Sequence, residues 1–136
     1  MKIVVIDTNV LISGIGWVGA PRKIIDAWID DKLTVVATPE IVEEYKRVSA
    51  IFSKKYAHLE FEHIVNKLLF TVKLFEPAKL TEGISCDLDD DKFIACALSA
   101  EAKVIISGDS DLLEISGYQG ISVLKPKSFL DRFGDR

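Results

Sequence analysis

An unbroken run of β-branched residues, Ile3 to Ile6, lies near the start of the chain and ends at Asp7. Such a run predicts a strand buried on both faces, as in a parallel sheet covered by helices. Open α/β folds bind their ligands at the carboxyl ends of such strands, so Asp7 is predicted to lie at a functional site. A carboxylate in that position needs a cation, a proton or hydrogen bonds to offset its burial.

The length of 136 residues predicts a single domain spanning residues 1–136. No apolar run approaches the roughly 20 residues of a membrane span, and the N-terminus enters a strand without the features of a signal peptide. We therefore expect a cytoplasmic protein with no membrane association. Cys86 and Cys96 form no CxxC motif and only two histidines are present, so a zinc site is not expected and both thiols are predicted to be reduced.

The formal net charge is −4, from 17 basic and 21 acidic residues. An acidic protein is not an obvious nucleic-acid binder, because phosphate contacts need lysine and arginine. If four of the acids served a metal site, however, the remainder of the chain would be neutral. The net charge therefore excludes no class of substrate here.

The hydrophobic pattern alternates between strands and helices along the whole chain. Strands are predicted near 3–6, 33–38, 72–75, 103–107 and 121–124, and helices at 21–31, 39–48, 59–70, 92–102 and 126–133, with a short helix after Asp7. Residues 49–57 are predicted to be a loop or a helix end. With right-handed crossovers, this order predicts a three-layer α/β/α sandwich around a parallel sheet of about five strands.

Residues 14–19 form a literal GxGxxG motif, which raises the possibility of a dinucleotide site. That site needs its first glycine directly after the strand and an acid at the end of the second strand. Here residues 7–13 intervene and the second strand ends at Thr38. We expect these glycines to form a flexible loop between two helices.

Three further acids are predicted to lie near Asp7. Glu44 lies on the border of the apolar stripe of its helix, Asp91 shares the buried face of the next acid-rich helix, and Asp109 follows the strand 103–107. Clustered carboxylates repel one another unless a hard cation is present, and oxygen-only ligands favour Mg²⁺ or Mn²⁺. An ion held in this way also takes phosphate oxygens, which predicts metal-assisted phosphate hydrolysis.

Four segments resemble the PIN-domain nucleases in order and spacing, most closely the prokaryotic toxins of the VapC type. They are residues 6–11 (IDTNVL), 39–44 (PEIVEE), 91–95 (DKFIA) and 106–109 (ISGD). The resemblance covers essentially the whole chain. It implies a metal-dependent endoribonuclease that hydrolyses phosphodiester bonds of RNA by means of a water activated by Mg²⁺ or Mn²⁺.

The resemblance also implies roles for particular residues. The catalytic and metal-binding acids of the family fall on Asp7, Glu44, Asp91 and Asp109. It implies that Asp7 and Asp91 hold the ion most directly, with Asp111 as a further candidate ligand. Asn9 and Ser107 match accessory positions that orient the carboxylates.

The resemblance further implies an RNA substrate and partner proteins. Toxins of this type pair with an antitoxin and commonly form homodimers or higher homo-oligomers. Candidate RNA contacts are Arg22, Lys23, Lys46, Arg47, Lys54 and Lys55, although each is equally well explained as a solvated surface residue.

Other functions remain open from the sequence. A haloacid-dehalogenase-like phosphatase also uses an aspartate after its first strand, but it needs a second one where this chain has Asn9. A response-regulator receiver lacks support because the expected acidic pair and late lysine are missing. A stand-alone RNA-processing PIN nuclease and a catalytically silent RNA- or protein-binding scaffold are the remaining alternatives, and a scaffold would have no need of four clustered acids.

Overall fold

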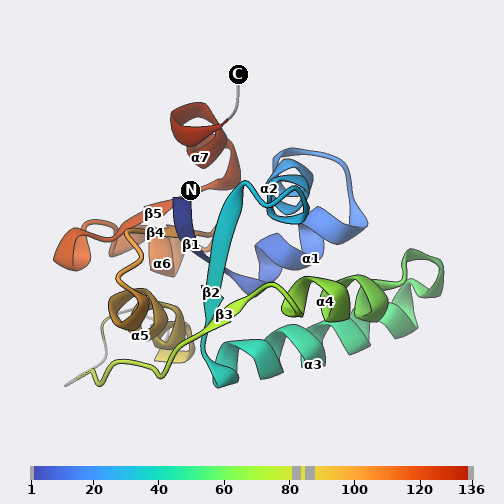
Figure 1. The fold of residues 1–136 in the computed structure, drawn as a ribbon, viewed down its shortest axis with the longest axis horizontal. Coiled ribbons are helices and arrows are strands. Elements are labelled where there is room, and N and C mark those ends of the chain that lie inside the picture. The colour runs from blue at the N-terminus through green and yellow to red at the C-terminus, as the bar shows by residue number, and fades with distance from the viewer. Residues whose placement is uncertain (1, 81–83, 85–87, 135–136) are drawn as a thin grey trace.

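The computed structural model describes residues 2–80, 84 and 88–134 (Figure 1). Cys86 and Asp87 lie outside the described residues. The elements are β1 (Lys2–Ile6), α1 (Thr8–Gly16), α2 (Ala20–Ile29), β2 (Leu33–Ala37), α3 (Pro39–Lys55), η1 (Ala57–Leu59), α4 (Phe61–Leu69), β3 (Lys73–Leu74), η2 (Leu88–Asp90), α5 (Asp91–Ala100), β4 (Val104–Ile106), α6 (Ser110–Glu114), η3 (Tyr118–Gly120), β5 (Ser122–Leu124) and α7 (Pro126–Phe133).

The five strands form one parallel sheet in the order β3-β2-β1-β4-β5. This confirms the predicted parallel sheet flanked by helices. The chain leaves β1 toward β2 on one side, whereas β4 pairs with β1 on the other. The carboxyl ends of β1 and β4 therefore border the switch point at which open α/β sheets bind ligands.

Helices pack on both faces of the sheet. Right-handed crossovers put α1 to α4 on one face and α5 on the other, and Figure 1 shows α5 across the strands from α1 and α2. The core between them includes Val4, Val5, Ile24, Phe93 and Ile105. No helix in the described part of the chain has the length and apolar character needed to cross a bilayer.

Helix α5 is buried almost all the way round, because β1, β2 and β4 cover one side of it and α3 and η2 also contact it. Cys96 in this helix is a buried free thiol, and burial raises its pKa to about 12. Such a thiol is a packing group and a poor nucleophile. The two histidines, His58 and His63, are exposed.

Helix α3 begins as predicted but is longer than predicted. Its start is capped by Thr38, whose hydroxyl oxygen accepts from the amide of Ile41 at 3.5 Å. The helix then continues to Lys55, so the helix end predicted within 49–57 is confirmed, whereas residues 49–55 are helical and not a loop. The additional turns stay helical because Phe52 continues the apolar stripe against α4. Helix α6 was not predicted by the pattern.

The glycine-rich segment is partly helical, so the prediction that it forms a loop is wrong for its first half. Gly14 and Gly16 lie inside α1. A Cβ on Gly14 would lie 2.6 Å from the carbonyl oxygen of Pro21 and would overlap Ile25. These glycines are therefore explained by the close packing of α1 against its neighbours.

Replacing Gly14 with alanine should destabilise the protein by about 1–3 kcal/mol, because the methyl group overpacks the contact with α2. Urea unfolding followed by circular dichroism measures the effect. Gly108→Ala is the control, since a Cβ there meets no heavy atom of the described residues within 4 Å. Equal stability of the two variants would contradict this explanation of Gly14.

Candidate metal centre

The register of β1 and β4 brings Asp7 next to Ser107. Ile6 pairs with Ile106, so the residue that follows each strand stands at the same edge of the sheet. The fully buried Ser107 hydroxyl donates to Asp7 Oδ2 at 2.6 Å and accepts from the amide of Asp109 at 3.0 Å. One hydroxyl thus fixes the positions of two acids that are far apart in the sequence.

Asp7 is a buried acid in an acidic environment. Burial raises its pKa, and the negative charges of Asp109 and Glu44 raise it further, whereas hydrogen bonds from the Ser107 hydroxyl and the Asn9 amide oppose the rise. The net pKa of Asp7 lies above its ordinary value. Asn9 contacts Asp7 through its backbone amide, and its side chain is exposed. A cation would relieve the repulsion at Asp7.

Three carboxylates beside this pair can hold a metal ion together. Asp90, Asp109 and Asp111 each offer an oxygen, and these oxygens lie within 4.8 Å of one another. Asp90 is only 8% exposed, and the Asp109 side chain also caps α6 by accepting from the Asp111 amide at 2.9 Å. Oxygen donors without thiolate or imidazole fit a hard divalent cation. The acidic cluster therefore fits the chemistry of a divalent metal site.

The structure brings Asp90, which was not among the predicted residues, into this group. Asp91 instead accepts a hydrogen bond at 3.0 Å from the amide of Ile84. Asp91 was predicted because it shares the buried face of α5. This helix is buried nearly all round, however, and therefore has no single inward face. In addition, residues 88–90 form a 3₁₀ turn, whose phase differs from that of the α-helix.

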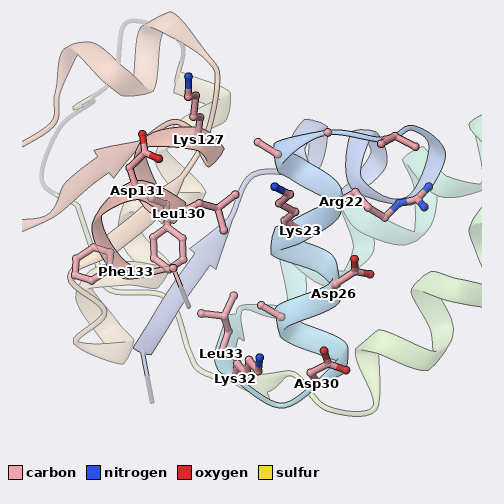
Figure 2. A pocket seen from close by; sticks show the side chains of 16 residues that line it. Arg22, Lys23, Asp26, Asp30, Lys32, Leu33, Lys127, Leu130, Asp131 and Phe133 are labelled. Atoms are coloured by element: carbon pink, nitrogen blue, oxygen red, sulfur yellow. The ribbon is translucent and has the colours of Figure 1, made fainter. Parts of the chain in front are cut away.

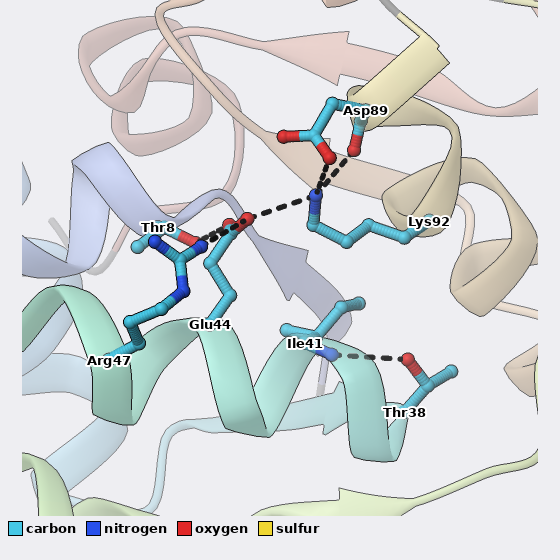
Figure 3. Close-up of polar contacts among 7 residues, drawn as sticks. All are labelled: Thr8, Thr38, Ile41, Glu44, Arg47, Asp89 and Lys92. Atoms are coloured by element: carbon cyan, nitrogen blue, oxygen red, sulfur yellow. Dashed lines mark hydrogen bonds and ion pairs between the residues drawn. The ribbon is translucent and has the colours of Figure 1, made fainter.

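Glu44 reaches toward the centre from α3, as predicted. The Thr8 hydroxyl donates to its Oε2, and the buried ammonium of Lys92 lies 2.9 Å from its Oε1 (Figure 3). Burial lowers the pKa of Lys92, but the hydrogen bond and charge of Glu44, followed by those of Asp89, outweigh burial and leave it raised. Neither Thr8 nor Lys92 was predicted. The sequence does not single out Lys92, because no local pattern shows that it faces Glu44.

The predicted substrate-binding cations are scattered over the molecule. Arg22 donates to the carbonyl oxygens of Gly14 and Ile15 at 2.8 and 3.1 Å, and with Lys23 it lines a groove between α2 and α7 (Figure 2). Arg47 lies 3.8 Å from Glu44 and so borders the acidic centre.

The other three cations lie along α3. Lys46 is exposed, and Lys54 and Lys55 stand at the end of the helix. At 1.5 Å per residue, that end is about 15 Å along the axis from Glu44. Of the six predicted cations, Arg47 is the one whose ion pair places it at the centre.

A family model described as the PIN domain matches residues 3–111. The chain therefore belongs to the PIN-domain family of nuclease-type hydrolases. It is also 33% identical to the uncharacterised protein MJ1680 of Methanocaldococcus jannaschii, over 96% of this chain and 90% of that protein.

The fold is similar to that of the crystal structure of PAE2754 from Pyrobaculum aerophilum. The TM-score is 0.61 at 19% sequence identity, and the match covers 96% of this chain and 88% of that one. At this identity, the similarity supports the fold alone.

Replacing Ser107 with alanine should weaken binding of Mn²⁺ by about 10- to 100-fold, because Asp7 and the Asp109 amide both lose the hydroxyl that positions them. Ser107→Thr keeps the hydroxyl and should stay close to wild type. Isothermal titration calorimetry measures both affinities. If the alanine variant binds Mn²⁺ as tightly as the threonine variant, the positioning role of Ser107 is refuted.

Proposed function

We propose that this protein is a metal-dependent endoribonuclease. The observation that carries the proposal is the set of Asp90, Asp109 and Asp111 oxygens within 4.8 Å of one another, beside the buried Asp7 at the sheet switch point. Membership of the PIN-domain family supports nuclease chemistry at this place. A Mg²⁺ or Mn²⁺ ion held there would supply an activated water and would neutralise charge on the scissile phosphate.

The residues of the centre have different tasks in this proposal. Asp90, Asp109 and Asp111 would hold the ion, and Asp7 would orient a water or complete the ligand set. Asp91 remains the alternative ligand from α5. Glu44 shapes the charge at one side of the centre, and Arg47 beside it is placed to contact an RNA phosphate.

The test is cleavage of a fluorophore- and quencher-labelled RNA by the purified protein in the presence of Mg²⁺, Mn²⁺ or EDTA. We expect cleavage with a divalent ion, none with EDTA, and recovery when the ion is restored. The same oligonucleotide made of DNA tests the choice of RNA. If RNA stays intact with both ions, or if cleavage survives EDTA, the proposed reaction is wrong.

We further propose that the nuclease is the toxin of a toxin–antitoxin pair and works as a homodimer or higher homo-oligomer. The resemblance to VapC-type toxins supports this, and the acidic centre is suited to an inhibitory segment that offers arginine. Induced expression should arrest growth, and coexpression with a small protein encoded next to it should restore growth. Harmless expression of an active nuclease would favour a stand-alone RNA-processing enzyme.

A further inference from the structure

A buried lysine lies within the acidic centre, beside Glu44. The side chain of Lys92 is 5% exposed. Its ammonium has three N–H donors, and three acceptors surround it: Glu44 Oε1 at 2.9 Å, Asp89 Oδ1 at 3.4 Å and the Asp89 carbonyl oxygen. The position of this cation is therefore fixed by Glu44 of α3 and by Asp89 of η2.

Both carboxylate oxygens of Glu44 have partners within the protein. Its Oε2 accepts from the Thr8 hydroxyl, its Oε1 faces the Lys92 ammonium, and the Arg47 guanidinium lies 3.8 Å from the same Oε1 (Figure 3). The negative charge of this carboxylate is thus already balanced by the Lys92 ammonium, and the Thr8 hydroxyl holds its other oxygen. A divalent ion bound directly to Glu44 would lie close to the Lys92 ammonium, and the repulsion between two cations in a largely buried site disfavours that arrangement.

The metal-capable oxygens lie elsewhere in the centre. The group formed by Asp90, Asp109 and Asp111 does not include Glu44 among the described residues. The centre thus has two parts. In one, the carboxylates of Asp90, Asp109 and Asp111 lie together, and in the other the Glu44 carboxylate is paired with Lys92. Two-metal nuclease sites need carboxylates that serve both ions.

We infer that Lys92 takes the place of a second divalent cation at Glu44, so that the protein binds a single divalent ion, at Asp90, Asp109 and Asp111. The inference rests on the proposed metal-dependent function and specifies its metal stoichiometry. In this arrangement Lys92 is a positioning residue, which holds Glu44 in place and keeps it from ligating metal.

Calorimetric titration of Mn²⁺ into the full-length protein tests the inference without any activity measurement. The wild type should bind one ion. Glu44→Gln should bind one ion with an affinity within about 3-fold of wild type, whereas loss of a direct ligand would cost well over 10-fold. Two ions bound by the wild type, or an affinity loss above 10-fold in Glu44→Gln, would overturn the inference.

Variants of Lys92 provide a second, independent test. Lys92→Met keeps the apolar stem of the side chain and removes the ammonium that pairs with Glu44, so this variant should bind a second Mn²⁺ ion. The double variant Lys92→Met/Glu44→Gln should lose that second site. Lys92→Arg keeps the positive charge and should bind one ion. A folded Lys92→Met protein that still binds one ion would overturn the inference, and if that variant does not fold, the wild-type and Glu44→Gln titrations decide.

The Mn²⁺ titration also distinguishes failure of this inference from failure of the proposed function. If the wild type binds no Mn²⁺ at all, the proposed metal-dependent function fails and the inference fails with it. If Mn²⁺ binds and RNA is cleaved but two ions are present, only the assignment of Lys92 is wrong.

Discussion

Asp7→Asn should abolish RNA cleavage, with a loss of at least about 100-fold. Substitutions that remove groups merely supporting a metal site cost 10–100-fold, and Asp7 is a charged group at the centre itself. The asparagine keeps an oxygen that can accept from the Ser107 hydroxyl, so the fold should be preserved. Single-turnover cleavage of labelled RNA in Mn²⁺ measures the loss.

The same variant should be more stable than the wild type in EDTA at neutral pH. The folded-state pKa of Asp7 is raised above the unfolded value, mainly by burial, so the folded state loses stability as the pH rises from the unfolded value through the folded one. Asparagine has no such loss, and its advantage over wild type should grow from pH 4 to pH 7.

Thermal unfolding of both proteins across this pH range tests the electrostatic explanation. Asp26→Asn, which changes an exposed carboxylate on α2, is the matched control and should retain both activity and stability. An Asp7→Asn protein that cleaves RNA at near the wild-type rate would remove Asp7 from the mechanism. An unfolded Asp7→Asn protein would contradict the electrostatic explanation.

Asp90→Asn and Asp91→Asn should differ sharply although the two residues are neighbours. Asp90 lies in the metal-capable group, so its substitution should weaken Mn²⁺ binding by at least about 10-fold and lower cleavage by a similar or larger factor. Asp91 contacts the Ile84 amide and lies in the first turn of α5, so its loss should mainly cost helix stability, about 0.3–1 kcal/mol.

Calorimetry with Mn²⁺ and urea unfolding of the two variants separate these effects. The substitutions are chemically identical and adjacent, so each serves as the control for the other. If Asp91→Asn loses metal affinity and Asp90→Asn does not, the ligand predicted from the sequence is correct, and the assignment of Asp90 is wrong.

Much of the fold follows from local pattern in the sequence. The run 3–6 has no polar face, so it belongs in the middle of a covered sheet, and β1 is indeed flanked by strands on both sides. The acid directly after such a strand then has to lie at the ligand-binding edge. The same reasoning led to Glu44 and Asp109, whose charges the structure places near Asp7, because a helix border and a strand end are both defined within a few residues.

The parts of the centre that were missed depend on tertiary contacts. The choice between Asp90 and Asp91 is set by a 3₁₀ turn before a helix that is buried all round, and neither feature appears in hydrophobic periodicity. Lys92 belongs to the centre only because α3 brings Glu44 to within 2.9 Å of it. Gly14 is small because α2 packs against it, and a glycine-rich stretch gives no local sign of such packing.

The most direct test of the metal centre is a crystal of the wild-type protein soaked in Mn²⁺ and measured at a wavelength where manganese scatters anomalously. We predict a single peak among the carboxylate oxygens of Asp90, Asp109 and Asp111, which form the group able to hold one hard cation. A peak bound to Glu44 or Asp91 instead, or no peak at this edge of the sheet, would contradict the account.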